Sequence, residues 1–472
     1  MKTLSSLLAF LACSVFASAK DRPNVVFLLA DDLGSGDLSC YGSPENKTPH
    51  LDKLATQGLK FSDFYAACAV CSPSRAALQT GRFSVRAGVY SWVATSQNMH
   101  LRVEETTVAE LLKAGGYSTA HVGKWHLGYD LADGSGDGPD PGDHGYDHWL
   151  ATGNNATPSH RNPVNFVRNG KALGKVEGYS CQIVVDEAID WLDNHRDKTK
   201  PFFLNVCFHE PHQRVASPPE LAARHPKVKQ PEYYGCIENM DDAAGRLLKK
   251  LDAMGVTDNT LVVFTSDNGS YRTDRANNRN LKGRKTQLWE GGIREPGIIR
   301  WPGKVKPGSI DTGHMVTTLD LMPTILEATD VKPAEKSDGA KRIAWDGRSI
   351  LPSLLGKKQP DPAVLFFNHA RGKAIRTGNW KLVFNKDGKK KAKWELYDIE
   401  KDRTETKNLA ASHPDKMKDL AEQWNAWAKR AKVYPKNKGA SNATALPNPP
   451  QVTGRPFTIT AEIEHGNPKG VV

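Results

Sequence analysis

The sequence has 472 residues, of which 39% are hydrophobic and 25% charged, with 40 glycines and 29 prolines. This composition can bury a large core, so it excludes wholesale disorder, a collagen-like repeat and a polytopic membrane protein. The net charge of +11 favours anionic partners such as nucleic acid, an anionic surface or a sulfated or phosphorylated substrate. Charge alone does not choose among them.

The N-terminal residues have the features of a secretory signal. Lys2 precedes an apolar stretch at residues 7–16, and small residues follow up to Ala19, so cleavage is expected after Ala19. The alternative, a lipidated Cys13, would leave a shorter apolar stretch. No later apolar run approaches the roughly 18 residues needed to span a bilayer. We therefore expect an exported protein, periplasmic or secreted, without stable membrane insertion.

Short apolar runs alternate with helical patterns along the first two thirds of the chain. Buried strands are predicted at residues 24–30, 118–123, 201–208 and 260–265, and helices at 106–114, 184–195 and 233–254. This alternation predicts an α/β fold, a large domain with a central, mostly parallel sheet flanked by helices.

A different pattern follows the last of these helices. A helix is predicted at residues 319–329, then short alternating strands at 373–377, 380–384 and 394–397, and finally a helix at 414–432. The expected organisation is a signal peptide (1–19), a catalytic domain (20–355), a small C-terminal subdomain with an antiparallel sheet and a helix (356–434), and an extended tail rich in Pro, Gly and Asn (435–472). Residues 457–463 alternate like a strand without an obvious partner.

Polar residues follow each of the four apolar strands. They are Asp31 and Asp32; Lys124, Trp125 and His126; His209, Glu210, Pro211 and His212; and Asp267 and Asn268. Ligands bind outside the carboxyl ends of such strands, so this convergence predicts one active site. The carboxylates with Asn268 form an all-oxygen set that suits calcium or magnesium, although in isolation each segment would be an ordinary turn.

Six cysteines remain after loss of the signal, too few for a disulfide scaffold, and none has zinc-ligand spacing. Cys71 lies near the start of a predicted helix, close to Arg75. We expect this environment to lower the pKa of the thiol and favour a nucleophilic role, the alternative being a structural cysteine.

The segment around Cys71 resembles the signature of the type I sulfatases, members of the alkaline phosphatase superfamily in which this cysteine is oxidised to formylglycine. The matching positions are Cys71, Pro73, Ser74, Arg75, Thr80, Gly81 and Arg82. Further blocks resemble the family at residues 31–38, 123–128, 266–269, 289–296 and 394–398. The resemblance covers approximately residues 22–409.

The resemblance implies a mechanism and one bound calcium ion. Cys71, converted by a separate maturation enzyme, would present a formylglycine hydrate; one hydroxyl attacks sulfur and leaves a sulfated enzyme, and the second then releases sulfate. The ion would be held by Asp31, Asp32, Asp267, Asn268 and the modified Cys71.

The resemblance also implies roles for the surrounding cations. Arg75 and Lys124 would orient the hydrate, and His126 would help to remove its second proton. Asp267 could act as base towards the attacking hydroxyl.

Two positions have competitors. His209 matches the general acid and competes with His212; we choose His209 as nearer the strand end. Lys285 would lie beside the leaving oxygen and competes with Lys282; we choose Lys285 for its distance to Glu290.

Polar and basic loop residues are expected around the sulfate pocket. The candidates for substrate binding are His100, Asn154, His160, Arg161, His212, Arg214 and Arg272. The sequence therefore predicts a sulfuric ester hydrolase, acting on a sulfated carbohydrate of glycosaminoglycan or algal type or on an aryl sulfate. The alternatives are a phosphonate monoester or phosphodiester hydrolase and a non-catalytic sulfoglycan-binding protein. Export and the lack of a recognisable binding module argue against nucleic acid.

Overall fold

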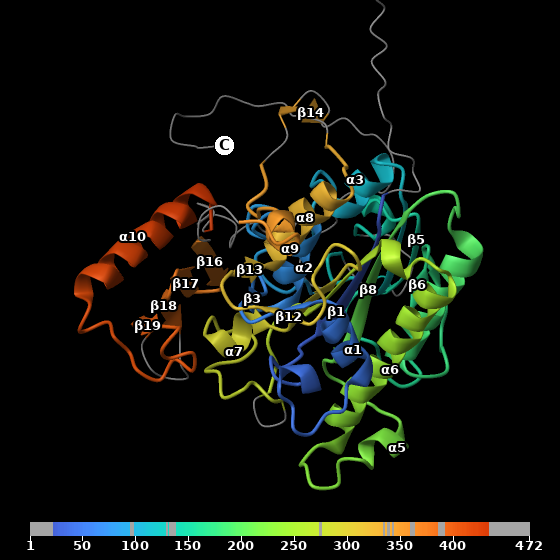
Figure 1. The fold of residues 1–472 in the computed structure, drawn as a ribbon, viewed down its shortest axis with the longest axis horizontal. Coiled ribbons are helices and arrows are strands. Elements are labelled where there is room, and N and C mark those ends of the chain that lie inside the picture. Colours follow the sequence, from blue (N-terminus) through green and yellow to red (C-terminus); the bar gives the residue numbers. More distant parts are fainter. Residues whose placement is uncertain are drawn as a thin grey trace, which may run out of the picture. The chain divides into compact units, whose positions relative to one another are not determined.

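Five parallel strands form the centre of the fold (Figure 1). The structure, a computed structural model, describes residues 22–94, 99–128, 131, 138–272, 276–333, 336–337, 340–341, 344–358, 364–385 and 392–433. The central strands are β9 (Thr260–Ser266), β1 (Asn24–Asp31), β8 (Phe202–Pro211), β4 (Ser118–Lys124) and β5 (His148–Thr152), in that spatial order. The four strands predicted from the sequence are therefore adjacent, which confirms the mostly parallel sheet.

Shorter strands extend this sheet at both margins, giving ten strands in all. On one side lie β11 (Gly297–Arg300), β2 (Leu59–Phe61) and β12 (Ser309–Asp311), and on the other β6 (Val167–Arg168) and β7 (Lys171–Ala172). β11 runs antiparallel to β9, and β6 antiparallel to β5. The parallel strands are thus shielded from the sheet edges, as buried parallel strands usually are.

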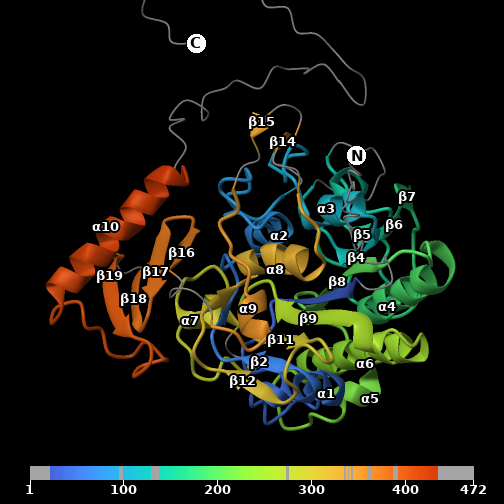
Figure 2. The same ribbon diagram turned by 45° about the horizontal axis from the view of Figure 1, so that its top comes forward.

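Helices cover both faces of the sheet, because alternate residues of each central strand point to opposite sides. Val25 and Phe27 of β1 pack under α2 (Cys71–Thr80), α3 (Val108–Ala114) and α8 (Leu321–Ala328). Val26 and Leu28 pack under α1 (Pro49–Gln57), α4 (Ser180–Asp190) and α6 (Pro231–Ala253). Figure 2 shows the two helical layers with the sheet between them.

The helices α3 and α4 begin at residues other than those predicted. α3 begins at Val108 because the Thr107 side chain accepts the Glu110 backbone N–H, while the Glu110 side chain accepts that of Thr107. α4 begins at Ser180, four residues before the predicted start, and continues as a π-helical segment, η4 (Trp191–His195).

The C-terminal part confirms the predicted antiparallel sheet and helix. The strands are β16 (Val364–His369), β17 (Gly372–Thr377), β18 (Trp380–Asn385) and β19 (Lys393–Asp398), and the helix is α10 (Pro414–Arg430). Trp424 and Leu420 of α10 pack against one face of this sheet, and Trp289 and Ile293 belong to the core on its other face. The sheet is therefore sandwiched between α10 and the region around α7 (Glu290–Ile293).

The remaining elements are short. They are β3 (Phe64–Tyr65), β10 (Arg294–Glu295), β13 (Val316–Thr317), β14 (Lys336–Ser337), β15 (Ala340–Lys341), α5 (Pro219–Ala222), α9 (Leu351–Leu354), η2 (Ser39–Tyr41), η3 (Gly142–His144), η5 (Thr257–Asn259) and η6 (Thr318–Asp320).

Within the described ranges, every helix is too short or too polar to cross a membrane. The six cysteines expected in the mature chain are all free thiols. The predicted signal at 1–19, the tail at 435–472 and its strand-like stretch at 457–463 lie outside the described residues.

Candidate active site

The polar residues predicted at the strand ends do meet. Asp31 is the last residue of β1, Lys124 the last of β4, and Asp267 directly follows β9. Lys124 Nζ lies 2.6 Å from Asp31 Oδ2. His212 directly follows β8 and completes the group at the carboxyl edge of the sheet.

Three oxygen atoms in this cluster are buried and accept no hydrogen bond from the described residues: Asp31 Oδ1, Asp32 Oδ2 and Asn268 Oδ1. The positive φ of 62° at Asp32 turns the chain where β1 ends. Asn268 Nδ2 then donates to Asp32 Oδ1 at 2.6 Å. Buried oxygens without donors are costly unless a cation satisfies them, so this donor set fits a hard divalent ion.

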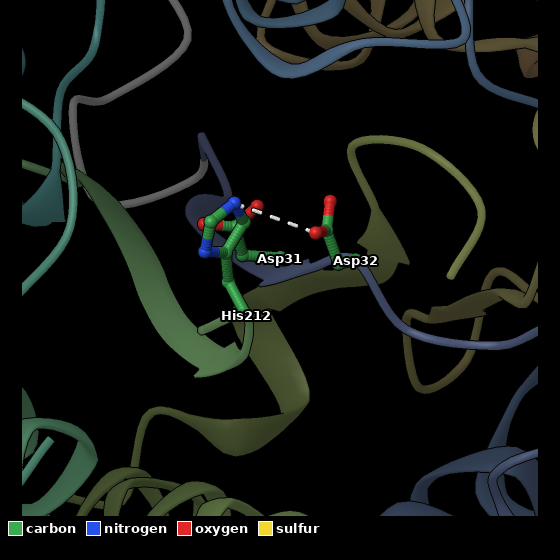
Figure 3. Close-up of side chains that lie close together, drawn as sticks. All are labelled: Asp31, Asp32 and His212. Carbon is green, nitrogen blue, oxygen red and sulfur yellow. Dashed lines mark ion pairs between the residues drawn. The ribbon is translucent and has the colours of Figure 1, made fainter. Parts of the chain in front are cut away.

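Two overlapping groups of potential ligand atoms lie within 4.8 Å of one another: Asp31 with Asp32 and His212, and Asp31 with Cys71 and Asp267. Figure 3 shows the first group, with the His212 ring close to both carboxylates. Asp31 belongs to both groups and is therefore the centre of the cluster.

Three buried cations face these carboxylates. Arg75 donates to Asp267 Oδ2 through Nε and lies equally close through Nη2, both at 2.9 Å. Its Nη1 donates to the Lys124 carbonyl at 2.9 Å. Lys285 Nζ lies 2.7 Å from Asp32 Oδ1. The hydrogen bonds from Nε and Nη1 fix the Arg75 guanidinium, so Arg75 connects Asp267 to the end of β4.

Two neighbouring carboxyl groups have opposite pKa shifts. Burial alone would raise the pKa of Asp31, but Lys124, then His212 and Arg75, outweigh it and hold that pKa well below its ordinary value. Burial, followed by the charge on Asp31, raises the pKa of Asp267 to about 7. Without a bound cation, the state in which Asp31 and Asp267 are both ionised is therefore unfavourable. A bound cation would stabilise that state.

Cys71 is the first residue of α2 and is 3% exposed. Burial raises the pKa of its thiol, despite the opposing charges of Lys285 and Lys124. The predicted lowered pKa is therefore wrong, because desolvation outweighs the nearby cations and the Arg75 guanidinium is committed to Asp267. A buried neutral thiol is a poor nucleophile.

Two histidines lie deep in the site. His126 Nε2 lies 2.9 Å from the Val93 carbonyl, and burial, with Lys124, holds the pKa of His126 well below its ordinary value. His209 Nε2 lies 2.7 Å from Thr152 Oγ1 at the end of β5, and burial lowers its pKa strongly as well. Both rings are neutral in this environment.

His212 occupies a different position from His209. β8 continues through Pro211, so His209 lies inside the strand and His212 is the first residue after it. This corrects the argument that His209 is nearer the strand end. The His212 side chain is 17% exposed, and its Nε2 lies 3.4 Å from Asp32 Oδ2.

The two competing lysines have separate partners. Lys285 contacts Asp32 in the cluster, whereas Lys282 Nζ donates to Glu395 Oε2 at 3.1 Å and to the Tyr397 hydroxyl at 2.9 Å. Lys282 therefore connects this loop to the C-terminal sheet.

The predicted substrate residues are less uniformly placed. His160 is fully buried, with Nδ1 3.7 Å from Glu210 Oε1 and 3.4 Å from Cys236 Sγ, so it packs behind the site. Arg161 and Arg214 are exposed, whereas Asn154, His100 and Arg272 are partly buried.

Two contacts were not predicted. Lys124 Nζ donates to Asn155 Oδ1 at 3.2 Å, and Thr152 holds His209. Thr152 ends β5 and Asn155 lies three residues later, and the sequence of β5 carried no recognised strand signal.

A buried nucleophile position beside an acidic cluster and several cations defines a hydrolase site for anionic esters. Similarity to known proteins identifies the ester. The Sulfatase family matches residues 23–331, and the C-terminal family of N-sulphoglucosamine sulphohydrolase matches residues 284–430. The chain belongs to the sulfatase family, within the alkaline phosphatase superfamily, and is a sulfuric ester hydrolase.

Named relatives agree. The chain is 35% identical to human arylsulfatase A over 78% of this chain and 75% of that protein. It is 31% identical to N-acetylgalactosamine-6-sulfatase of Canis lupus familiaris over 78% and 73%. The crystal structure of Ps i-CgsB in complex with k-i-k-neocarrahexaose superposes with a TM-score of 0.78 at 29% identity, covering 86% of this chain and 93% of that chain.

Proposed function

We propose that this sulfatase removes sulfate from a sulfated carbohydrate, using one calcium ion and a formylglycine made from Cys71 by a separate maturation enzyme. The observation that supports a bound metal ion is a set of three buried oxygen atoms, on Asp31, Asp32 and Asn268, that accept no hydrogen bond from the described residues. Oxygen donors suit a hard cation, and Asp267 lies close enough to contribute. When bound, the ion supplies Lewis-acid polarisation of the ester oxygens.

The chemistry of Cys71 supports its conversion. Because burial keeps the thiol neutral, an unmodified Cys71 would attack sulfur poorly. Formylglycine supplies a hydrate hydroxyl as the nucleophile. The helix start fixes the position of Cys71, and Lys285 and Lys124 lie near enough to counter negative charge there.

The surrounding residues have separate tasks. Arg75 holds Asp267, and Lys124 spans Asp31 and Asn155. Both thereby orient the acidic cluster against the sulfate. Lys285 places a cation beside Asp32, where the ester oxygens would bind. His126, neutral and held by the Val93 carbonyl, can accept a proton on Nδ1.

We assign protonation of the leaving oxygen to His212 instead of His209. His212 is partly exposed and borders the acidic cluster, so a bound ester can reach its ring. His209 is buried, and its Nε2 is engaged by Thr152. His209 then has a structural role, as a buried side chain that packs close to the cluster.

The carbohydrate assignment comes from relatives and from the rim of the site. N-acetylgalactosamine-6-sulfatase is named for a sulfated sugar, and Ps i-CgsB was crystallised with a neocarrahexaose. Arg161 and Arg214 are exposed, and the backbone N–H of His160 donates to the Arg214 carbonyl at 3.2 Å. We expect the two arginines to add positive charge near the substrate. The net charge of +11 is consistent with a polyanionic substrate of glycosaminoglycan or algal type.

The same proposal includes export after cleavage at Ala19, and a division at about residues 355/356 between a catalytic domain and the C-terminal subdomain. N-terminal sequencing of the mature protein tests the cleavage site.

The proposed function is tested by peptide mass spectrometry across Cys71, combined with sulfate release from sulfated oligosaccharides. We expect the mass loss that accompanies replacement of the thiol by an aldehyde, and activity that is abolished in C71A. An active protein with an unmodified thiol at Cys71 would contradict the formylglycine mechanism.

A further inference from the structure

Three aromatic side chains of the described residues are exposed to solvent: Tyr90 at 40%, Trp92 at 47% and Tyr271 at 47%. Trp and Tyr carry large apolar surfaces and are on average well buried. The other exposed large hydrophobic residues of the described chain are aliphatic. Two of these three aromatic residues, Trp92 and Tyr271, belong to segments that are hydrogen-bonded to residues of the site.

Trp92 belongs to a segment attached directly to the catalytic residues. The backbone N–H of Val93 donates to Ser72 Oγ at 2.9 Å, and Ser72 is the neighbour of Cys71. The carbonyl of Val93 lies 2.9 Å from His126 Nε2. These two bonds hold the backbone of Val93, the next residue after Trp92, beside Ser72 and His126, while about half of the Trp92 surface remains exposed.

Tyr271 belongs to a second segment, attached to the metal side of the site. It lies three residues after Asn268, and the carbonyl of the preceding Ser270 accepts the backbone N–H of Lys285 at 2.9 Å. The Tyr271 carbonyl accepts a bond from Arg284 at 3.5 Å. Trp92 is thus the neighbour of a residue bonded to Ser72 and His126, and Tyr271 lies in a segment bonded to Arg284 and Lys285.

We propose that Trp92 and Tyr271 form an aromatic platform at the mouth of the sulfate pocket, on which a sugar ring of the substrate stacks. The proposal rests on the proposed carbohydrate substrate and names residues that would select it. A pyranose presents an apolar C–H face, which packs well on the electron-rich face of an indole or phenol ring. Trp and Tyr also lose little conformational entropy on binding, because each has two side-chain torsions.

The location favours a sugar over a protein partner. Asp31, Cys71 and Lys285 are almost fully buried, so the sulfate must enter deeply and the rest of the substrate must lie nearer the surface. A contact on the rim is remote from sulfur and changes little during bond cleavage. It therefore stabilises ground state and transition state alike, and its loss raises KM without lowering kcat.

The test compares W92A, Y271A and W92F with the parent enzyme on a sulfated oligosaccharide, with inorganic sulfate as a competitive inhibitor that has no ring. Ile310 is 56% exposed in the edge strand β12, so I310A is the matched control for loss of exposed apolar surface. Stacking of this kind predicts a rise in KM of about tenfold in W92A and somewhat less in Y271A, with kcat within about twofold. W92F should retain most of the affinity, and the Ki of sulfate should stay unchanged.

An unchanged KM in both W92A and Y271A would overturn the platform while leaving the proposed function intact. So would a parallel rise in KM and in the Ki of sulfate, because that pattern means a disturbed sulfate pocket. A parent enzyme that cleaves aryl sulfates but none of a panel of sulfated sugars would contradict the carbohydrate substrate and the platform together. The thermal midpoints of all variants should match that of the parent, since the substituted side chains are exposed.

Discussion

Replacing His212 by glutamine should slow the hydrolysis of a sugar sulfate by about 10²–10⁴-fold in kcat, the usual contribution of a positioned general acid. At 1.36 kcal/mol per tenfold, this is a loss of roughly 3–5 kcal/mol of transition-state stabilisation. The leaving group is then a sugar alkoxide, which is too basic to depart without a proton. His212 is the partly exposed imidazole that borders the acidic cluster, 3.4 Å from Asp32.

The matched variant H209Q should behave differently. Its ring is 1% exposed and hydrogen-bonded to Thr152 at 2.7 Å, so the substitution disturbs a buried polar pair. We expect a loss of roughly 1–3 kcal/mol in the free energy of unfolding, and a smaller loss of kcat that is similar for all esters.

The assay uses two leaving groups and a range of pH. With 4-nitrophenyl sulfate the phenolate leaves without protonation, so H212Q should lose less than about tenfold. Burial lowers the pKa of His212, partly offset by Asp32, so its protonated form increases as pH falls below the ordinary value of 6.5. Turnover of the sugar ester by the parent should therefore decline as pH rises through that pKa, and H212Q should lack this dependence.

Two results would refute the assignment. A loss in H209Q that depends on the leaving group, with none in H212Q, would return the general acid to His209. Equal losses on both esters in H212Q would mean that His212 only positions Asp32.

Three other perturbations have defined outcomes. Calcium binding should release a proton and weaken as pH falls below about 7, because Asp267, with its raised pKa, must ionise to bind the ion. Calorimetry in two buffers measures the proton release. A calcium affinity that does not depend on pH would count against Asp267 as a ligand. K285M should lose at least about 10²-fold in kcat, because Lys285 contacts Asp32 in the acidic cluster. K282M loses a contact with the C-terminal sheet, so it should lower the thermal midpoint and leave kcat near the parent value. Equal losses of kcat in the two variants would contradict the choice of Lys285 over Lys282. W424A should lower the free energy of unfolding, measured in urea, by about 3–5 kcal/mol, because the Trp424 ring is fully buried against the antiparallel sheet. A decrease below about 1 kcal/mol would show that α10 contributes little stability.

The central sheet could be predicted because several of its strands contain an apolar run, such as residues 25–30 of β1 and 261–264 of β9. All eight residues of β1 are buried, and its apolar run lies between Asn24 and Asp31. β5 lacks that signal: it begins with His148 and ends with Thr152, and its burial depends on neighbours distant in sequence. The missed strand also hid the contact of Thr152 with His209.

The end of β8 shows a second limit. Proline removes a ladder donor, so Pro211 argues locally against a strand, and the predicted strand stops at residue 208. In the fold Pro211 is still paired with Asp31, after an irregularity in the register. The three strand residues beyond the predicted end place His209 within β8 and His212 directly after it, and only the tertiary pairing reveals them.

The charges of the site fit the order of events that the proposed reaction requires. Asp31, Asp32 and Asp267 face Arg75, Lys124 and Lys285, so full ionisation leaves the protein side chains balanced. With Asp267 protonated near neutral pH, the metal-free cluster has an excess of one positive charge. A divalent cation displaces that proton and makes the cluster more positive still, and an anionic sulfate monoester then partly neutralises it. Metal binding should therefore strengthen the binding of an anionic ester, whereas a neutral ester gains nothing from the added charge, which gives a metal-dependent preference for anionic monoesters over neutral esters.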